Sequence, residues 1–92
     1  MADALAVYSA SALIHTGPGQ LMGLLLTASA GVPLATFYNN TAGSGTKLLE
    51  LYVPSTQAIE IFFSERFAPA FVIGLYLTLA ANLTATVWSR QL

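Results

Sequence analysis

Hydrophobic and polar residues alternate with a period of two along several short segments of this chain. In residues 57–63, Ile59, Ile61 and Phe63 fall on one side of the alternation and Glu60 falls on the other. Successive side chains of a β-strand point to opposite faces of a sheet, so this segment is predicted to be a strand with one buried face. The same pattern predicts strands over residues 21–27, 33–38, 47–53, 73–79 and 83–88, and a weaker form of it occurs over residues 5–8 and 11–15.

Turn-forming residues separate these segments at fairly even spacing. Glycine, proline, asparagine and serine supply the backbone angles that turns require, and they cluster at residues 17–19, 29–31, 39–46, 54–56 and 81–82. Segment 39–46 is the longest and most polar, and we expect a mobile hairpin connection at the rim of the domain. No stretch of about ten residues has the 3.6-residue period of a helix. The chain is therefore predicted to be all-β, a single antiparallel β-sandwich or jelly roll of about seven or eight short strands.

The inward positions of these strands predict the hydrophobic core. The aliphatic residues expected there are Leu49, Leu51, Ile59, Ile61, Leu75 and Leu77. Residues 21–27 differ from the other segments because they are apolar on both faces. The outer face of a sandwich strand normally meets water and is polar, so a neighbouring subunit is expected to cover the second face of this strand.

The low content of charged residues also predicts contact with other subunits. Only 8% of the 92 residues are charged, against roughly 25% in an average soluble domain, and none lies between Asp3 and Lys47. A domain of this size buries only about 60–65% of its unfolded surface when it folds alone, so much of the remaining surface must be apolar. Extensive exposed apolar surface marks contact with other molecules. We therefore expect a homo-oligomer, with a trimer favoured, within a larger assembly.

Composition also narrows the classes of partner. A net charge of −1 and three basic residues do not build a phosphate-binding surface, so nucleic acid is not an expected partner. The apolar stretches at residues 20–30 and 67–81 are shorter than the roughly 20 residues of a membrane-spanning helix, so no membrane association is expected. Asp3 stands where a secretion signal carries positive charge, so residues 1–15 are not expected to be such a signal. Cysteine is absent, which excludes disulfides and thiolate chemistry.

Few side chains of this chain could carry a reaction. His15 is the only histidine, so a site with two histidine ligands cannot form within one chain, and a role in satisfying the adjacent turn is expected for it. Glu50 and Glu60 lie on strands that are expected to be neighbours and could pair across a sheet. Ion pairs with Lys47 or Arg66 are the favoured use of these two glutamates. No catalytic residue, metal site or cofactor is predicted, and the chain is expected not to be an enzyme.

The residues expected to contact other subunits are aromatic or charged. Glu65 and Arg66 interrupt an otherwise apolar stretch, which favours a turn at an edge or an intersubunit ion pair. Residues 1–15 have a weak strand pattern and are interpreted either as an N-terminal arm that binds a neighbour or as strands added to the sandwich domain of residues 16–92. The candidate subunit-contact residues are Tyr8, His15, Glu65, Arg66, Tyr76 and Trp88.

Four segments of the chain form a recognisable order of motifs. They are SALIHTGPGQLMG at residues 11–23, TFYNNTAGSGT at 36–46, GLYLTL at 74–79 and TATVW at 84–88. This order resembles that of small structural proteins of tailed-bacteriophage virions. The resemblance implies a non-enzymatic protein that decorates or cements the capsid surface and contacts the major capsid protein or other virion proteins. Such a protein is assembled in the host cytoplasm.

Three other functions stay open, one of them that of a small membrane-associated protein. Within the same class, the chain would be a tail, connector or fibre component of the virion. In a different class, it would be a small carbohydrate-binding β-sandwich module, which needs aromatic side chains clustered on one exposed face. The candidates for such a cluster are Tyr38, Tyr52, Tyr76 and Trp88.

Overall fold

The computed structural model describes residues 3–64 and 66–91, and it contains nine strands and no helix within these ranges. The strands are β1 (Asp3–Tyr8), β2 (Ala12–Thr16), β3 (Gly19–Ala28), β4 (Leu34–Asn39), β5 (Thr46–Tyr52), β6 (Ala58–Phe62), β7 (Ala70–Phe71), β8 (Gly74–Leu79) and β9 (Leu83–Gln91). Across the described ranges, no helix is long and apolar enough to span a membrane.

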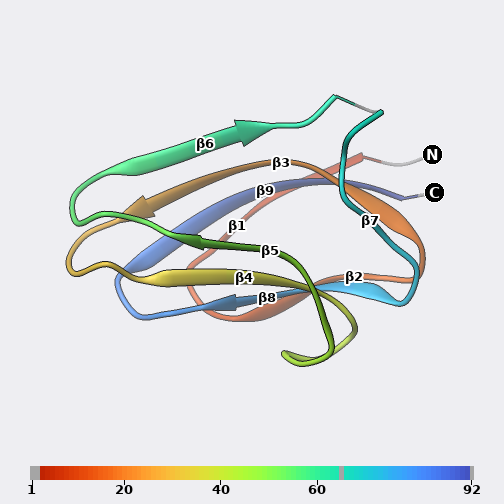
Figure 1. The fold of residues 1–92 in the computed structure, drawn as a ribbon, viewed down its shortest axis with the longest axis horizontal. Coiled ribbons are helices and arrows are strands. Elements are labelled where there is room, and N and C mark those ends of the chain that lie inside the picture. The colour runs from red at the N-terminus through yellow and green to blue at the C-terminus, as the bar shows by residue number, and fades with distance from the viewer. Residues whose placement is uncertain (1–2, 65, 92) are drawn as a thin grey trace.

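Two antiparallel sheets lie on either side of the core (Figure 1). Sheet A contains β1, β9, β3 and β6 in that order, with the short β7 paired to the first residues of β3. Sheet B contains β2, β8, β4 and β5 in that order. The chain crosses from one sheet to the other at every link except β4–β5 and β6–β7, which is the arrangement of a jelly roll. The all-β prediction is confirmed, and the strand order distinguishes the jelly roll from other sandwiches.

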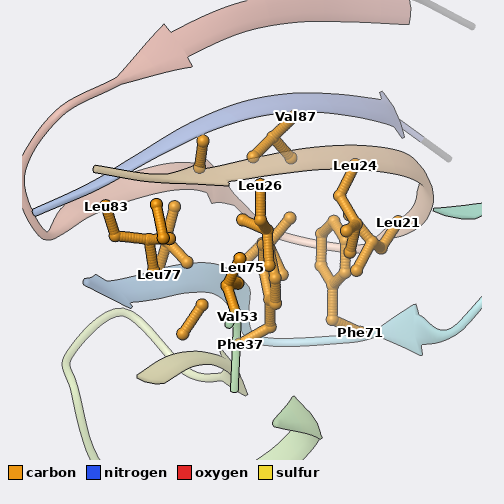
Figure 2. Packing of buried hydrophobic residues seen from close by; sticks show 13 residues of the cluster. Leu21, Leu24, Leu26, Phe37, Val53, Phe71, Leu75, Leu77, Leu83 and Val87 are labelled. Atoms are coloured by element: carbon orange, nitrogen blue, oxygen red, sulfur yellow. The ribbon is translucent and has the colours of Figure 1, made fainter. Parts of the chain in front are cut away.

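The core lies between the sheets and is built from the inward positions of the long strands. Figure 2 shows Leu24 and Leu26 of β3 on one side of this layer and Phe37 of β4 on the other. Burying one leucine side chain completely stabilises the folded state by about 1.5–3 kcal/mol relative to leaving it exposed. Of the predicted core residues, Leu75 and Leu77 are completely buried. Four others lie on the edge strands β5 and β6, and are only half-buried against this cluster: Leu49, Leu51, Ile59 and Ile61.

The N-terminal segment belongs to the sheets from Asp3 onward. Strand β1 pairs with β9 and strand β2 pairs with β8, so that each forms an edge of its sheet. Of the two interpretations of residues 1–15, the described part therefore has the strands and not a free arm. The sequence pattern of β1 is weak because Leu5 and Val7 point outward and are exposed, while the small Ala6 is half-buried between them.

The strand predicted over residues 73–79 begins at Gly74, and the side chain of Ile73 is exposed. The Oδ1 atom of Asn39 accepts hydrogen bonds from the backbone N–H groups of Val72 and Ile73, each 3.1 Å long. The N–H of Gly17 donates to the carbonyl of Ile73 at 2.9 Å. These bonds fix a bend between β7 and β8 that leaves the Ile73 side chain outside the core.

Segment 39–46 joins β4 and β5 as the predicted hairpin. Its expected freedom is limited by contacts at its base and at its tip. The Nδ2 atom of Asn40 donates to the carbonyl of Ser44 at 2.8 Å, and Gly45 adopts a positive φ of 97°, which glycine tolerates without strain. A Cβ at Gly43 would lie 3.3 Å from the Tyr76 ring, so the loop folds back over the outer face of sheet B.

Candidate protein-contact surface

The outward side of sheet A carries two rows of side chains that the strand pairing aligns. Leu5 pairs with Trp88, Trp88 with Gly23, and Gly23 with Phe62, and residues directly opposite one another share a face. The next row, in the same order of strands, is Val7, Thr86, Leu25 and Glu60. These eight residues are called the sheet A face below.

A shallow groove runs through the sheet A face beside Gly23. The ring of Phe62 meets that of Trp88 edge-to-face, with 6.4 Å between centroids and 60° between planes. Phe62 also covers the Gly23 backbone, because a Cβ at Gly23 would lie only 2.6 Å from a Phe62 ring carbon. The groove has a volume of about 340 Å³ and is lined by Leu5, Gly23, Leu24, Leu25, Glu60, Phe62, Thr86 and Trp88.

The groove is apolar and open to solvent. Leu5, Val7 and Phe62 are 71%, 68% and 63% exposed, because they project outward from the edge strands β1 and β6. Glu60 is the one ionisable side chain among the described residues that line the groove. Large exposed apolar side chains gathered on one face indicate a contact surface for another molecule.

Polar residues bound the sheet A face at both ends. Thr27 pairs with Thr84 beyond the row that contains Val7 and Glu60. The Thr27 hydroxyl donates to the Thr84 carbonyl at 3.5 Å. Gln20 pairs with Arg90 beyond the row that contains Leu5 and Phe62. An apolar centre with a polar periphery is the usual anatomy of a protein–protein interface.

A second group of exposed apolar side chains lies within residues 66–73, between β6 and β8. Phe67 and Val72 are 75% and 68% exposed, and Ile73 is 53% exposed. The guanidinium of Arg66 lies 6.0 Å from the centroid of the Phe67 ring, a cation–π contact at the distance limit for such pairs. Glu65, predicted to form a charged turn with Arg66, lies outside the described residues.

On the outer face of sheet B, three polar side chains contact one another. Lys47 Nζ lies 2.9 Å from Glu50 Oε2, which confirms one of the predicted ion pairs, and the Thr36 hydroxyl donates to the same oxygen at 3.4 Å. The hydrogen bond and charge of Lys47 lower the pKa of Glu50, and Glu50 in turn raises the pKa of Lys47. Both side chains are exposed, so this pair contributes little to stability.

The structure distributes the predicted contact residues over the whole molecule. Tyr8 packs against the core. The ring of His15 meets that of Phe71 edge-on, with 5.4 Å between the ring centroids. The Nε2 atom of His15 is buried and has no hydrogen-bond partner. Tyr76 is half-buried on the outer face of sheet B under the hairpin, and Trp88 is half-buried on the sheet A face. Arg66 is exposed.

Two groupings of residues that the sequence left possible do not form. Glu50 and Glu60 cannot pair across one sheet, because β5 belongs to sheet B and β6 to sheet A, and both side chains point outward in opposite directions. The aromatic residues considered for carbohydrate binding are likewise divided. Tyr38 pairs with Tyr76 on sheet B, whereas Trp88 lies on sheet A.

Sequence reasoning singled out Trp88 but not the residues that surround it. Phe62 lies next to Ile61 in a strand whose inward side was predicted correctly, so the alternation itself indicated that Phe62 points outward with Glu60. Leu5 and Val7 gave no comparable signal, since their pairing with β9 follows only from the register.

The fold defines the chain as a small antiparallel jelly-roll domain with an exposed apolar face. No family model matches the chain, and no curated protein matches it.

Proposed function

We propose that this chain is a non-enzymatic structural protein of a bacteriophage virion, namely a decoration or cement protein that stabilises the assembled capsid. The observation that carries the proposal is that large apolar side chains are exposed in two separate parts of the chain, the sheet A face and residues 66–73. A protein that links subunits needs at least two contact surfaces, one for each neighbour.

Three further features support this assignment. The jelly roll is a fold found in viral capsid proteins. The order of motifs along the chain resembles that of small virion proteins. The described ionisable side chains are dispersed, with Glu50 and Glu60 on opposite outer faces, so they do not converge on a substrate site.

The proposed mechanism is thermodynamic. A homo-oligomer of this chain binds neighbouring copies of the major capsid protein through residues 66–73. Because it binds the assembled shell and not the separated subunits, it shifts the equilibrium towards the assembled state. Phe67 is suited to anchor this contact, since buried aromatic residues dominate the energetics of protein interfaces and its side chain is 75% exposed in the isolated chain.

The test uses purified phage particles from cells that carry the gene. Quantitative mass spectrometry of density-banded particles should find the chain in a fixed, high ratio to the major capsid protein. Particles made without the chain should release DNA at a lower temperature, and added wild-type protein should restore the release temperature. The variant Phe67→Ser should fold normally but restore it poorly.

Each other outcome contradicts the proposal. Absence of the chain from particles excludes a virion role, and a few copies per particle indicate a tail, connector or fibre component. Stoichiometric occupancy without any change in release temperature excludes cementing. Selective binding on a glycan array, together with absence from particles, favours the carbohydrate-binding alternative.

A further inference from the structure

We propose that the sheet A face binds a second copy of this chain, and that the two copies form a symmetric dimer. The twofold axis runs parallel to the strands, between β9 and β3. This inference goes beyond the proposed function, because it names the surface that joins two copies and holds whether or not the dimer belongs to a virus particle.

The argument begins with the order of strands in sheet A. A half-turn about this axis keeps the position of each row along the strand direction and reverses the order of the strands. Strand β1 of one copy then faces β6 of the other, and β9 faces β3. Trp88 of one copy then lies over Gly23 of the other, and Leu5 lies over Phe62. The largest side chain of the row thus opposes Gly23, whose backbone is covered by the Phe62 ring of its own chain, and it packs on that ring beside the groove. An interface with twofold symmetry requires this kind of self-complementary surface.

The groove supplies the space that this arrangement needs. It has a volume of about 340 Å³ and lies beside Gly23 and Leu25, at the positions that oppose Trp88 and Thr86 of the second copy. Packed sheets lie about 10 Å apart with their strands nearly aligned. At this separation, side chains from both sheets interdigitate, so Trp88 of each copy can occupy the groove of the other.

The outer surface of sheet A, which includes the sheet A face, is large enough for a dimer. The four strands are five to ten residues long. At about 3.3 Å per residue and about 4.8 Å between strands, they cover roughly 500 Å² in each copy. Two copies would therefore bury roughly 1,000 Å² in total, the lower limit for a specific interface. A contact of this size predicts a dimer that dissociates on dilution.

The charges on the face are compatible with a second copy. The apolar rows occupy the centre, whereas Arg90 and Gln20 oppose one another beyond one row and Thr84 and Thr27 beyond the other. Glu60 lies on the edge strand β6 and opposes Val7 of the second copy. This one charge–apolar pair lies at the periphery of the contact, and it provides a specific test.

The experiment measures the mass of the full chain in solution by light scattering, together with the fluorescence of Trp88, the only tryptophan. The mass should be twice the 9.7 kDa of one chain at high concentration and should fall on dilution. The emission of Trp88 should shift to longer wavelength as the face becomes exposed to water. Val7→Glu should weaken association at least about tenfold, because it places a carboxylate opposite the Glu60 carboxylate of the second copy.

Two variants make the test specific to this geometry. Val7→Glu combined with Glu60→Lys should restore the dimer by pairing opposite charges. Val72→Glu is the matched control, since Val72 and Val7 are equally exposed at 68%, and it should leave the mass unchanged. Circular dichroism verifies that each variant keeps its β-structure.

A mass of one chain at all concentrations would overturn the inference, as would a trimer mass. Equal effects of Val7→Glu and Val72→Glu, or failure of the double variant to restore a dimer, would also overturn it. These results are separable from those that bear on the proposed function. A dimer that is absent from virus particles contradicts the virion assignment alone, and a particle-bound monomer contradicts the dimer alone.

Discussion

The outer faces of the two sheets differ in how much of their surface the chain itself covers. On sheet B, Lys47 pairs with Glu50, Thr36 bonds to Glu50, and the hairpin lies against Tyr76. On sheet A, the outward side chains of Leu5 and Phe62 remain mostly exposed. Both sheets share one core, so the difference arises from the outward residues alone.

This difference separates two uses of a sheet surface. The polar pairs and the hairpin make the outer face of sheet B compatible with water. The sheet A face has apolar groups that lower their free energy only when another surface excludes water from them. We therefore expect the proposed contacts with partners at the sheet A face and at residues 66–73, and not on the outer face of sheet B.

The largest expected effect comes from the shared core. Leu77→Ala removes a completely buried side chain of β8 and should lower the free energy of unfolding by about 2–5 kcal/mol. Both outer faces should be disturbed together, because both are supported by this core. Urea denaturation measures the change, and a loss below about 1 kcal/mol would show that β8 does not pack as described.

The next effect should separate the two faces. Phe62 on sheet A and Tyr52 on sheet B are 63% and 62% exposed, so the two positions form a matched pair. Phe62→Ala should weaken self-association by about tenfold or more, because truncation of an aromatic residue at an interface centre is costly. Tyr52→Ala should have no effect on association. Sedimentation equilibrium gives both values, and equal losses would remove the distinction between the faces.

A smaller change should strengthen the contact. Glu60→Leu replaces the one carboxylate among the described groove residues with an apolar side chain that opposes Val7 of the second copy. The dimer should dissociate at a concentration a fewfold lower than wild type, since a partly desolvated charge no longer opposes an apolar group. Unchanged or weaker association, measured by light scattering on dilution, would place Glu60 outside the interface.

The smallest effect concerns the Lys47–Glu50 pair of sheet B. The pKa of Glu50 is lowered, so its contribution is fully present above the ordinary pKa of glutamate and is lost as the pH falls through the lowered value. The pKa of Lys47 is raised, so its contribution is lost as the pH rises through the raised value. Glu50→Gln should abolish this loss of stability at acid pH, measured as a small fall in the thermal midpoint, and added salt should make the fall smaller. A large change in the thermal midpoint would mean that the pair is more buried than its exposure indicates.

Much of the fold could be predicted from the sequence because strand alternation is local. In residues 57–63 and 83–88, aliphatic residues alternate with residues predicted to point outward, and the structure places both sets as predicted. Strand β1 gave a weak signal because an edge strand packs on one side only and here has its larger apolar residues outward.

The candidate surface depends on register, which the sequence does not reveal. Trp88 was recognisable as a contact residue, but its row with Gly23 and Phe62 arises from pairing between strands more than 20 residues apart. The strands of Glu50 and Glu60 were expected to be neighbours, which is wrong because β5 and β6 belong to different sheets. Consecutive strands of a jelly roll commonly belong to different sheets, so closeness along the chain does not imply closeness across a sheet.

The most direct test of the central claim compares the reactivity of two single cysteines. The natural chain has none, and Thr86 and Thr78 are half-buried outward residues of sheet A and sheet B. Thr86→Cys and Thr78→Cys are labelled with a maleimide at concentrations above and below that of dimer dissociation. The account predicts that labelling at position 86 slows several-fold at high concentration, whereas labelling at position 78 does not change. Equal rates at position 86 across the concentration range would contradict it.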